Sequence, residues 1–143
     1  MSSDRREFLK TGCKLCIGAV SAGLIFSSSA CKTSGGLYAG KTKNGFLVVP
    51  LKAFSDSKML IVQTINFREP LLLVREGDGK AHALLMRCTH RNTQLELTGD
   101  QLICPAHGSI FDMNGKVLQS PASDALTSFS GIESEKDIQI KIE

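Results

Sequence analysis

Short apolar runs separated by turn residues fill most of the chain after residue 45. The runs lie at residues 46–49, 59–65, 71–75, 81–87, 101–104, 109–112, 116–118 and 138–142. Turn sequences rich in Gly, Asp and Asn separate several of them, as at Glu76–Gly79, Thr98–Asp100 and Asn114–Gly115. Short runs bounded by such turns are typical of β-strands and hairpins. The pattern therefore predicts an all-β fold, a small antiparallel sandwich or barrel, with one short helical turn near residues 93–97.

The first 31 residues follow a different pattern. Adjacent arginines, Arg5 and Arg6, are followed by Phe-Leu-Lys and then by an uncharged run whose strongly apolar part is residues 15–26. A membrane span needs roughly 20 apolar residues, whereas a signal segment needs roughly 7–15. The pattern resembles a twin-arginine export signal. We expect a cleavable signal helix over residues 1–31, with an uncleaved membrane anchor as the alternative.

Cys31 ends this segment and follows the small residues Ser28-Ser29-Ala30. Small residues before a cysteine resemble a lipoprotein processing site, although Ser28 stands where such sites usually have Leu. Lipidation of Cys31 would tether the protein to a membrane. The alternative is cleavage nearby, which leaves Cys31 an ordinary thiol. Residues 32–44, with their Gly, Ser and Lys, are predicted to be a flexible linker to a domain at 45–143.

Composition and charge are those of an ordinary folded domain. The chain has 143 residues, 42% hydrophobic and 22% charged, with a net charge of +3. From Cys31 onward there are 13 basic and 12 acidic residues, so the mature part is nearly neutral. It has no Trp and one Tyr. Neither a basic surface nor an aromatic stacking surface is available, and a nucleic-acid partner is therefore not expected.

Two of the five cysteines remain once the N-terminal segment is set aside. Cys13 and Cys16 lie inside the predicted signal, which leaves Cys88 and Cys104 in the domain. Each is followed closely by a histidine, in the sequences Cys88-Thr89-His90 and Cys104-Pro105-Ala106-His107. A disulfide between the two cysteines is one interpretation for an exported protein. It leaves both histidines unexplained.

The four side chains are better explained as ligands of one metal centre. A structural zinc also takes two cysteines and two histidines, but typically as a cysteine pair and a histidine pair. Here each pair is mixed, which suits an asymmetric cluster of two irons. A Cys–His nucleophile would use only one of the two pairs. The spacing therefore predicts one 2Fe–2S cluster held by Cys88, His90, Cys104 and His107.

The sequence around these ligands resembles the cluster-binding segment of Rieske 2Fe–2S proteins. The matching stretches are Cys-Thr-His-Arg-Asn-Thr-Gln-Leu at residues 88–95 and Cys-Pro-Ala-His-Gly-Ser-Ile-Phe-Asp at 104–112, followed by Gly115 and Pro121. The resemblance implies a Rieske-like sandwich or barrel with a small cluster-binding subdomain at about residues 86–118. It also implies that the two cysteines bind one iron and the two histidines the other. The histidines would lie at an exposed tip where partners dock.

Differences from the high-potential members of that family affect the expected potential. Those proteins have two further cysteines that bridge the cluster loops, and here Ala106 occupies the place of the second. Ser109 matches a family serine whose hydroxyl donates to a cluster sulfur, but Phe111 replaces a tyrosine that also donates. Leu95 is expected to pack beside the cluster. Fewer donors destabilise the reduced cluster, so we predict an intermediate to low potential for the class.

The resemblance implies a carrier of single electrons with no substrate-converting site of its own. It would be exported to the periplasmic side, either soluble or tethered, and could act as the small subunit of a larger oxidoreductase. Its partners would be a cytochrome, an oxidoreductase large subunit or a quinol complex. The alternatives are the Rieske subunit of a quinol–cytochrome c reductase and a structural zinc-binding module. A Rieske oxygenase would need a second iron site, and the chain has no histidine after His107.

Overall fold

The computed structural model describes residues 37–143, so the predicted signal helix and Cys31 lie outside the described residues. The described part contains twelve strands and a 3-10 helix, η1. Their bounds are β1 Tyr38–Ala39, β2 Lys41–Lys43, β3 Phe46–Pro50, η1 Leu51–Phe54, β4 Met59–Gln63, β5 Leu71–Gly77, β6 Lys80–Leu85, β7 Glu96–Thr98, β8 Gln101–Ile103, β9 Ile110–Phe111, β10 Val117–Gln119, β11 Ser128–Glu133 and β12 Asp137–Lys141. The all-β prediction is confirmed.

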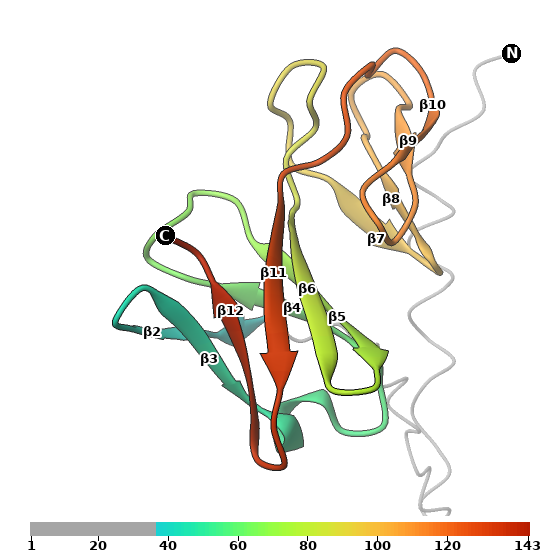
Figure 1. The fold of residues 1–143 in the computed structure, drawn as a ribbon. Coiled ribbons are helices and arrows are strands. Elements are labelled where there is room, and N and C mark those ends of the chain that lie inside the picture. The colour runs from blue at the N-terminus through green and yellow to red at the C-terminus, as the bar shows by residue number, and fades with distance from the viewer. Residues whose placement is uncertain (1–36) are drawn as a thin grey trace, which may run out of the picture. The chain divides into compact units, whose positions relative to one another are not determined.

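Eight strands form one large sheet in the order β1-β4-β5-β6-β11-β12-β3-β2. Its two outermost strands, β1 and β2, are separated in the chain only by Gly40, so the sheet is nearly closed into a barrel (Figure 1). The Gly40 N–H donates to the Gln63 carbonyl at 2.8 Å and extends the pairing of β1 with β4. Near closure leaves little unpaired strand edge, and this protects the sheet from unwanted pairing.

The remaining four strands form a small antiparallel sheet in the order β10-β9-β8-β7. Figure 1 shows it beyond the end of β6, with the loops that carry the predicted ligands beside it. The small sheet is the predicted cluster-binding subdomain, and the large sheet is its base.

The end of strand β6 is buried on both of its faces, which explains the unbroken apolar sequence of residues 83–86. Ala83 and Leu85 point into the core of the large sheet. Leu84 points the other way, into a second core shared with the small sheet, and Met86 just after the strand joins that core. Because side chains alternate between faces along a strand, a strand between two cores has no polar face. Because both faces are packed, the end of β6 is held in place, and with it the start of the first ligand loop.

The structure corrects two local predictions and adds one strand that the sequence did not indicate. The expected linker at 32–44 contains strands β1 and β2, which complete the large sheet. The helical turn expected near residues 93–97 is absent, because residues 96–98 form β7 and pair with β8. Strand β11 was not predicted, although it pairs with both β6 and β12 in the large sheet.

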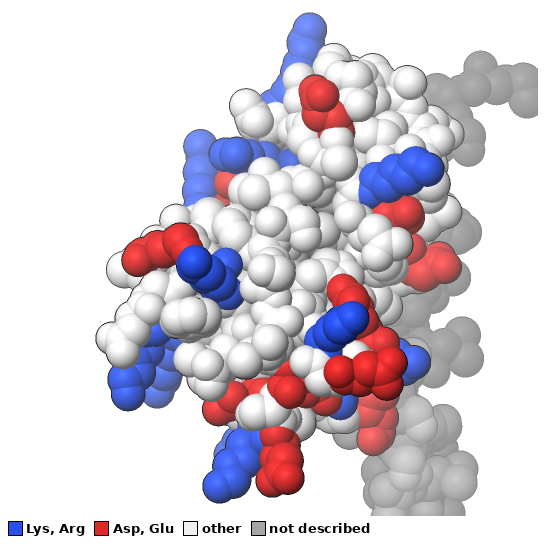
Figure 2. Space-filling view, viewed as in Figure 1, with Lys and Arg blue, Asp and Glu red and all other residues white. Residues whose placement is uncertain are grey.

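The described residues carry no strong charge of one sign on the face seen in Figure 2. Acidic and basic side chains are interspersed there around a wide uncharged area. This distribution agrees with the near-neutral charge of the domain and gives no electrostatic basis for binding a polyanion. Within residues 37–143, no helix is long and apolar enough to cross a membrane.

Gly115 lies in the turn between β9 and β10 and packs closely against the second core. Its φ is +80°, and a Cβ at this position would lie 3.0 Å from Leu84 Cδ2 and 3.2 Å from Leu126 Cβ. Gly77 also has a positive φ, +85°, but a Cβ there would meet nothing within 4 Å. Both positions therefore favour glycine for their backbone, and only Gly115 also requires it for packing.

We expect Gly115→Ala to destabilise the protein more than Gly77→Ala. Both substitutions carry the backbone penalty of a positive φ, about 1–2 kcal/mol. Only Gly115→Ala adds crowding in the core, about 1 kcal/mol or more. Denaturant unfolding of the two variants measures the difference. Equal losses of stability would contradict the packing role of Gly115.

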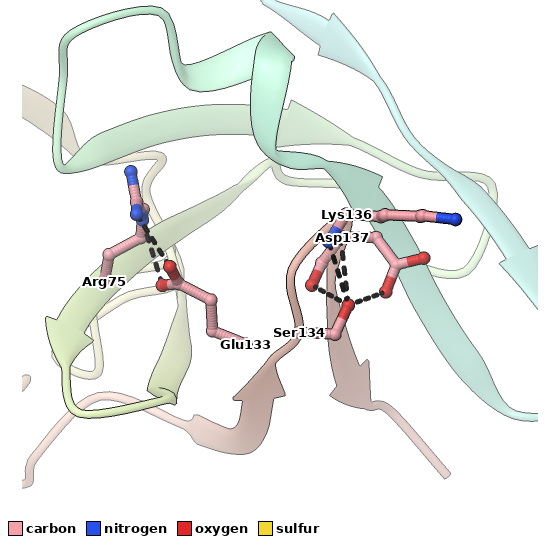
Figure 3. Close-up of polar contacts among 5 residues, drawn as sticks. All are labelled: Arg75, Glu133, Ser134, Lys136 and Asp137. Atoms are coloured by element: carbon pink, nitrogen blue, oxygen red, sulfur yellow. Dashed lines mark hydrogen bonds and ion pairs between the residues drawn. The ribbon is translucent and has the colours of Figure 1, made fainter.

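Arg75 and Glu133 form a two-pronged ion pair between β5 and β11 (Figure 3). Arg75 Nε lies 3.0 Å from Glu133 Oε2, and Nη2 lies 2.7 Å from Oε1. The hydrogen bonds from the guanidinium lower the pKa of Glu133 below its usual range, against the opposing effect of burial. The same hydrogen bonds raise the pKa of Arg75 above its usual value. A close parallel pair of this kind is among the stronger surface ion pairs.

Because the folded-state pKa of Glu133 is depressed, its contribution to stability is complete above the pKa of an unfolded glutamate, about 4.3. It is lost as the pH falls through the lower folded-state value. Glu133→Gln should therefore lower the free energy of unfolding by about 0.2–1 kcal/mol at neutral pH, and less in strong acid. The exposed Glu135→Gln serves as the control. A loss of stability that does not change with pH would contradict the ion-pair account.

Candidate metal centre

The first ligand loop follows β6 and is closed by its own backbone. The Cys88 N–H donates to the Thr93 carbonyl at 2.8 Å, and the Asn92 N–H donates to the Cys88 carbonyl at 2.8 Å. Asn92 has a φ of +57°, a conformation that Asn tolerates better than most residues. The closed turn carries His90 between its two hydrogen-bonded ends.

The second ligand loop follows β8 and has the same hydrogen-bond pattern. The Cys104 N–H donates to the Ser109 carbonyl at 2.8 Å, and the Gly108 N–H donates to the Cys104 carbonyl at 2.9 Å. Gly108 has a φ of +77°. In both loops the residue four places after the cysteine has a positive φ, and the residue five places after it closes the turn. The two loops are therefore structurally equivalent.

The equivalent loops bring the four predicted ligands together in two pairs. Cys88 and Cys104 are buried, each 1% exposed, and neither is in a disulfide. The ring centroids of His90 and His107 are 5.0 Å apart, with the rings nearly perpendicular at 83°. His90 is half-buried, whereas His107 is exposed. The thiols thus lie inside the domain, and the imidazoles lie toward its surface.

Hydrogen bonds prepare the Cys104 sulfur for a negative charge. Burial raises the pKa of the Cys104 thiol, but the other contacts outweigh it and the pKa is lowered overall. The backbone N–H groups of Ala106 and His107, and the side chains of Cys88 and Thr93, are the causes that lower the pKa of this thiol. A thiolate is the form of cysteine that binds metal. The loop therefore favours the ligating form.

The residues present fit a two-iron cluster. In the described part of the chain, His90 Nδ1 is the buried side-chain nitrogen without a hydrogen-bond partner. A buried polar atom without a partner is costly, and ligation of a metal would satisfy it. Two thiols and two imidazoles are also the donor set of a 2Fe–2S cluster that has cysteine on one iron and histidine on the other.

Apolar side chains surround the two thiols. Leu95 and Phe111 are 1% and 0% exposed and pack in the same core cluster as Cys88 and Cys104. Ser109 is also fully buried, at 0% exposed. Burial among apolar groups keeps water from the sulfurs, and this is one of the factors that set a cluster's potential.

A third loop, residues 120–126, contacts both ligand loops. Its Ala122 N–H donates to Ser109 Oγ at 3.0 Å, and the Thr89 hydroxyl donates to the Asp124 carbonyl at 2.7 Å. Sequence reasoning missed the roles of Thr89 and Thr93. For Thr93 a signal was present, because it follows Cys88 by five places, as Ser109 follows Cys104.

Comparison with known families agrees with this arrangement. The model of the Rieske [2Fe-2S] domain matches residues 46–130. The chain therefore belongs to the Rieske [2Fe-2S] domain family, whose domain binds one 2Fe–2S cluster.

Two relatives illustrate the range of that family. The chain is 39% identical over 70 residues to the oxygenase component of chloroacetanilide N-alkylformylase from Rhizorhabdus wittichii, covering 47% of this chain and 20% of that protein. It is 37% identical over 65 residues to the cytochrome b6-f complex iron-sulfur subunit of Prochlorococcus marinus, covering 43% of this chain and 36% of that protein. The chain thus spans only about a fifth and about a third of these relatives.

Two solved structures share the fold over nearly their whole length. The plasma membrane Rieske protein PetC3 from Synechocystis PCC 6803 superposes with a TM-score of 0.54 and 26% identity, over 64% of this chain and 94% of that chain. A chain from the complex of reduced oxygenase and oxidised ferredoxin in carbazole 1,9a-dioxygenase gives a TM-score of 0.54 and 25% identity, over 71% of this chain and 96% of that chain.

Proposed function

We propose that this protein carries single electrons between redox partners, with a 2Fe–2S cluster held by Cys88 and Cys104 on one iron and by His90 and His107 on the other. The observation that carries the proposal is the pair of equivalent loops, each with a buried thiol and a histidine nearer the surface. When bound, the cluster supplies a centre that accepts and returns one electron.

The protein's own residues have distinct tasks in this proposal. The buried cysteines provide thiolates in a water-poor core, and the donors around Cys104 stabilise its negative charge. The exposed ring of His107 lies where a partner can approach closely. The carrier needs no substrate pocket, because electrons transfer between proteins whose centres come near each other.

The structural matches support a carrier role for this domain. Residues of this chain cover 94% and 96% of two solved Rieske chains. The 37% identity to a cytochrome b6-f iron-sulfur subunit supports a second candidate, the Rieske subunit of a quinol–cytochrome c reductase. The absent bridging cysteine at Ala106 and the absent hydroxyl at Phe111 count against this second candidate.

A redox titration followed by visible absorption or film voltammetry tests the choice. Histidine-ligated clusters span about −150 to +300 mV. We expect a reversible one-electron midpoint below about +250 mV, because Phe111 offers no hydroxyl and no disulfide joins the loops. A midpoint above that value would instead support the quinol-oxidising type.

The N-terminal segment completes the proposal. We expect residues 1–31 to direct export by the twin-arginine route, which carries folded proteins and would allow the cluster to be inserted first. Lipidation of Cys31, or an uncleaved signal, would hold the 45–143 domain at the periplasmic face of a membrane, and cleavage would release it as a soluble protein. The partner would be a cytochrome, the large subunit of an oxidoreductase or a quinol complex. The export route is tested with a variant in which Arg5 and Arg6 are both changed to Lys. We expect cell fractionation to find this variant in the cytoplasm. A variant that is still exported would contradict the twin-arginine route.

A further inference from the structure

His82 is the histidine that the proposed cluster does not use. The chain has three histidines, and the other two are the predicted ligands His90 and His107. His82 lies within β6 and is buried, at 8% exposed. Because side chains alternate along a strand, its ring lies on the same face as Leu84, which packs in the core shared with the small sheet. A buried polar ring in such a place needs hydrogen-bond partners for its nitrogens.

Both ring nitrogens of His82 have close partners, and the partners belong to different sheets. Nδ1 lies 2.6 Å from Oε1 of Glu76, which belongs to β5 in the large sheet. Nε2 lies 2.7 Å from the carbonyl oxygen of Met113, in the turn between β9 and β10 of the small sheet. The ring therefore bridges the large sheet and the β9–β10 hairpin.

The chemistry of the two partners determines how many protons the bridge needs. A backbone carbonyl only accepts hydrogen bonds, and so does an ionised carboxylate. A neutral imidazole has one N–H, so it can satisfy one partner while its other nitrogen faces a second acceptor. An imidazolium donates from both nitrogens. The complete bridge between Glu76 and Met113 therefore requires a His82 ring that carries both protons.

The ring borders an open hollow that other polar side chains also line. These side chains are Glu76 of β5, Lys80 of β6, Asn114 of the β9–β10 turn, and Ser128 and Ser130 of β11. Glu76 and Lys80 are the charged members of this set, and Glu76 is the one in contact with the ring. The Glu76 side chain is 45% exposed, so the pH of the solution acts directly on the bridge.

We propose that His82 is a positioning residue that holds the β9–β10 hairpin on the large sheet as an imidazolium, and that loss of one ring proton weakens this link. The link is complete on the acid side of that proton loss and is weakened as the pH rises through it. The hairpin includes Phe111, which is fully buried in the same core as Cys88 and Cys104. His82 thus makes the support of the small sheet depend on pH. The bridge is independent of the cluster, because none of its groups is a predicted ligand.

The test compares the full chain with three variants over about pH 5 to 8, the range in which imidazoles titrate. His82→Gln removes the titrating ring. Glu76→Gln replaces an acceptor by an amide, which can accept or donate and so suits Nδ1 with or without its proton. Lys80→Gln is the matched control, because it changes a charge on the same hollow without touching the bridge.

Denaturant unfolding and hydrogen exchange are the two stability measurements. We expect the free energy of unfolding of the wild type and of Lys80→Gln to fall with rising pH, relative to Glu76→Gln and His82→Gln. The Asp112 amide donates to the Lys116 carbonyl across the hairpin and reports on it locally. Its protection from exchange, corrected for the intrinsic rate, should fall with pH in the wild type and stay constant in Glu76→Gln.

Nitrogen NMR of the histidine-labelled protein measures the ring protons directly, with the His82 signals assigned by their loss in His82→Gln. We expect both nitrogens to be protonated at the acid end of the range, and one to lose its proton as the pH rises. A ring with a single proton throughout, or the same pH dependence of stability in the wild type and Glu76→Gln, would overturn the proposed role of His82. The comparison with Glu76→Gln decides the matter even if His82→Gln fails to fold.

Discussion

Cys104→Ser is expected to abolish the 2Fe–2S cluster while the chain still folds into its large sheet. Serine has nearly the shape of cysteine, but its hydroxyl stays protonated at neutral pH and is a poor ligand for iron. Cys104 is 1% exposed, and its pKa is lowered by donors that would face an uncharged hydroxyl in the variant. Without the cluster, His90 Nδ1 would remain buried and without a partner.

The measurements are iron content, visible absorption and thermal unfolding. We expect iron to fall from about two atoms per chain to near zero, with a loss of visible colour and a lower midpoint temperature. Cys31→Ser is the matched control, because it removes a cysteine that the proposal keeps outside the site, and it should retain full iron. A coloured Cys104→Ser protein with two irons per chain would contradict the ligand assignment.

Ser109→Ala is expected to have two separate effects, one on stability and one on potential. The Ser109 hydroxyl oxygen accepts the Ala122 N–H at 3.0 Å where both residues are buried. Its removal leaves a buried N–H without a partner, which costs about 1–3 kcal/mol. The hydroxyl proton is not used in that bond, and the family resemblance assigns it to a cluster sulfur. Its loss should therefore lower the midpoint potential.

Denaturant unfolding and voltammetry measure the two effects independently. Ser123→Ala provides the control, because Ser123 is exposed on the same third loop and bonds only to Asp124. This control should change stability by less than about 0.5 kcal/mol and leave the potential unchanged. If Ser109→Ala changed stability and midpoint potential as little as Ser123→Ala does, Ser109 would support neither the third loop nor the potential of the cluster.

Strands with a clear apolar pattern could be predicted from the sequence, and those without one could not. Strand β12 alternates Ile and polar residues, and its prediction was correct to within a residue or two. Strand β11 lies between β6 and β12 but reads Ser-Phe-Ser-Gly-Ile-Glu, without an apolar face. At Gly131, an added Cβ would lie 2.3 Å from Ile140 Cδ1, so a close neighbour fills the space that an apolar side chain would normally occupy.

Strands β1 and β7 were missed for a related reason. Strand β1 has two residues and is stabilised by a partner distant in the sequence. Strand β7 has three residues and is stabilised by a partner across a tight turn. Tyr38–Ala39 pairs in parallel with β4, more than twenty residues away. Because such pairing is a tertiary effect, local composition indicated a linker at β1 and a helical turn near β7 instead.

The candidate site was largely accessible from sequence, because its ligands lie in two compact motifs. The structure places Cys88, Cys104, Leu95 and Phe111 in one buried cluster, and the ligand assignment itself stays a prediction. The hydrogen bond from the Thr89 hydroxyl to the Asp124 carbonyl was not accessible, because it joins the first ligand loop to a loop more than thirty residues later. Only the folded arrangement brings these two segments together.

The EPR spectrum of the dithionite-reduced full chain tests the central claim most directly. Mixed cysteine and histidine ligation leaves one iron more weakly surrounded by negative charge than in an all-cysteine cluster. The expected result is a Rieske-type signal, with an average g value below that of all-cysteine 2Fe–2S clusters, integrating to one spin per chain. An EPR-silent protein that contains zinc, or a signal of the all-cysteine type, would contradict the assignment of Cys88, His90, Cys104 and His107.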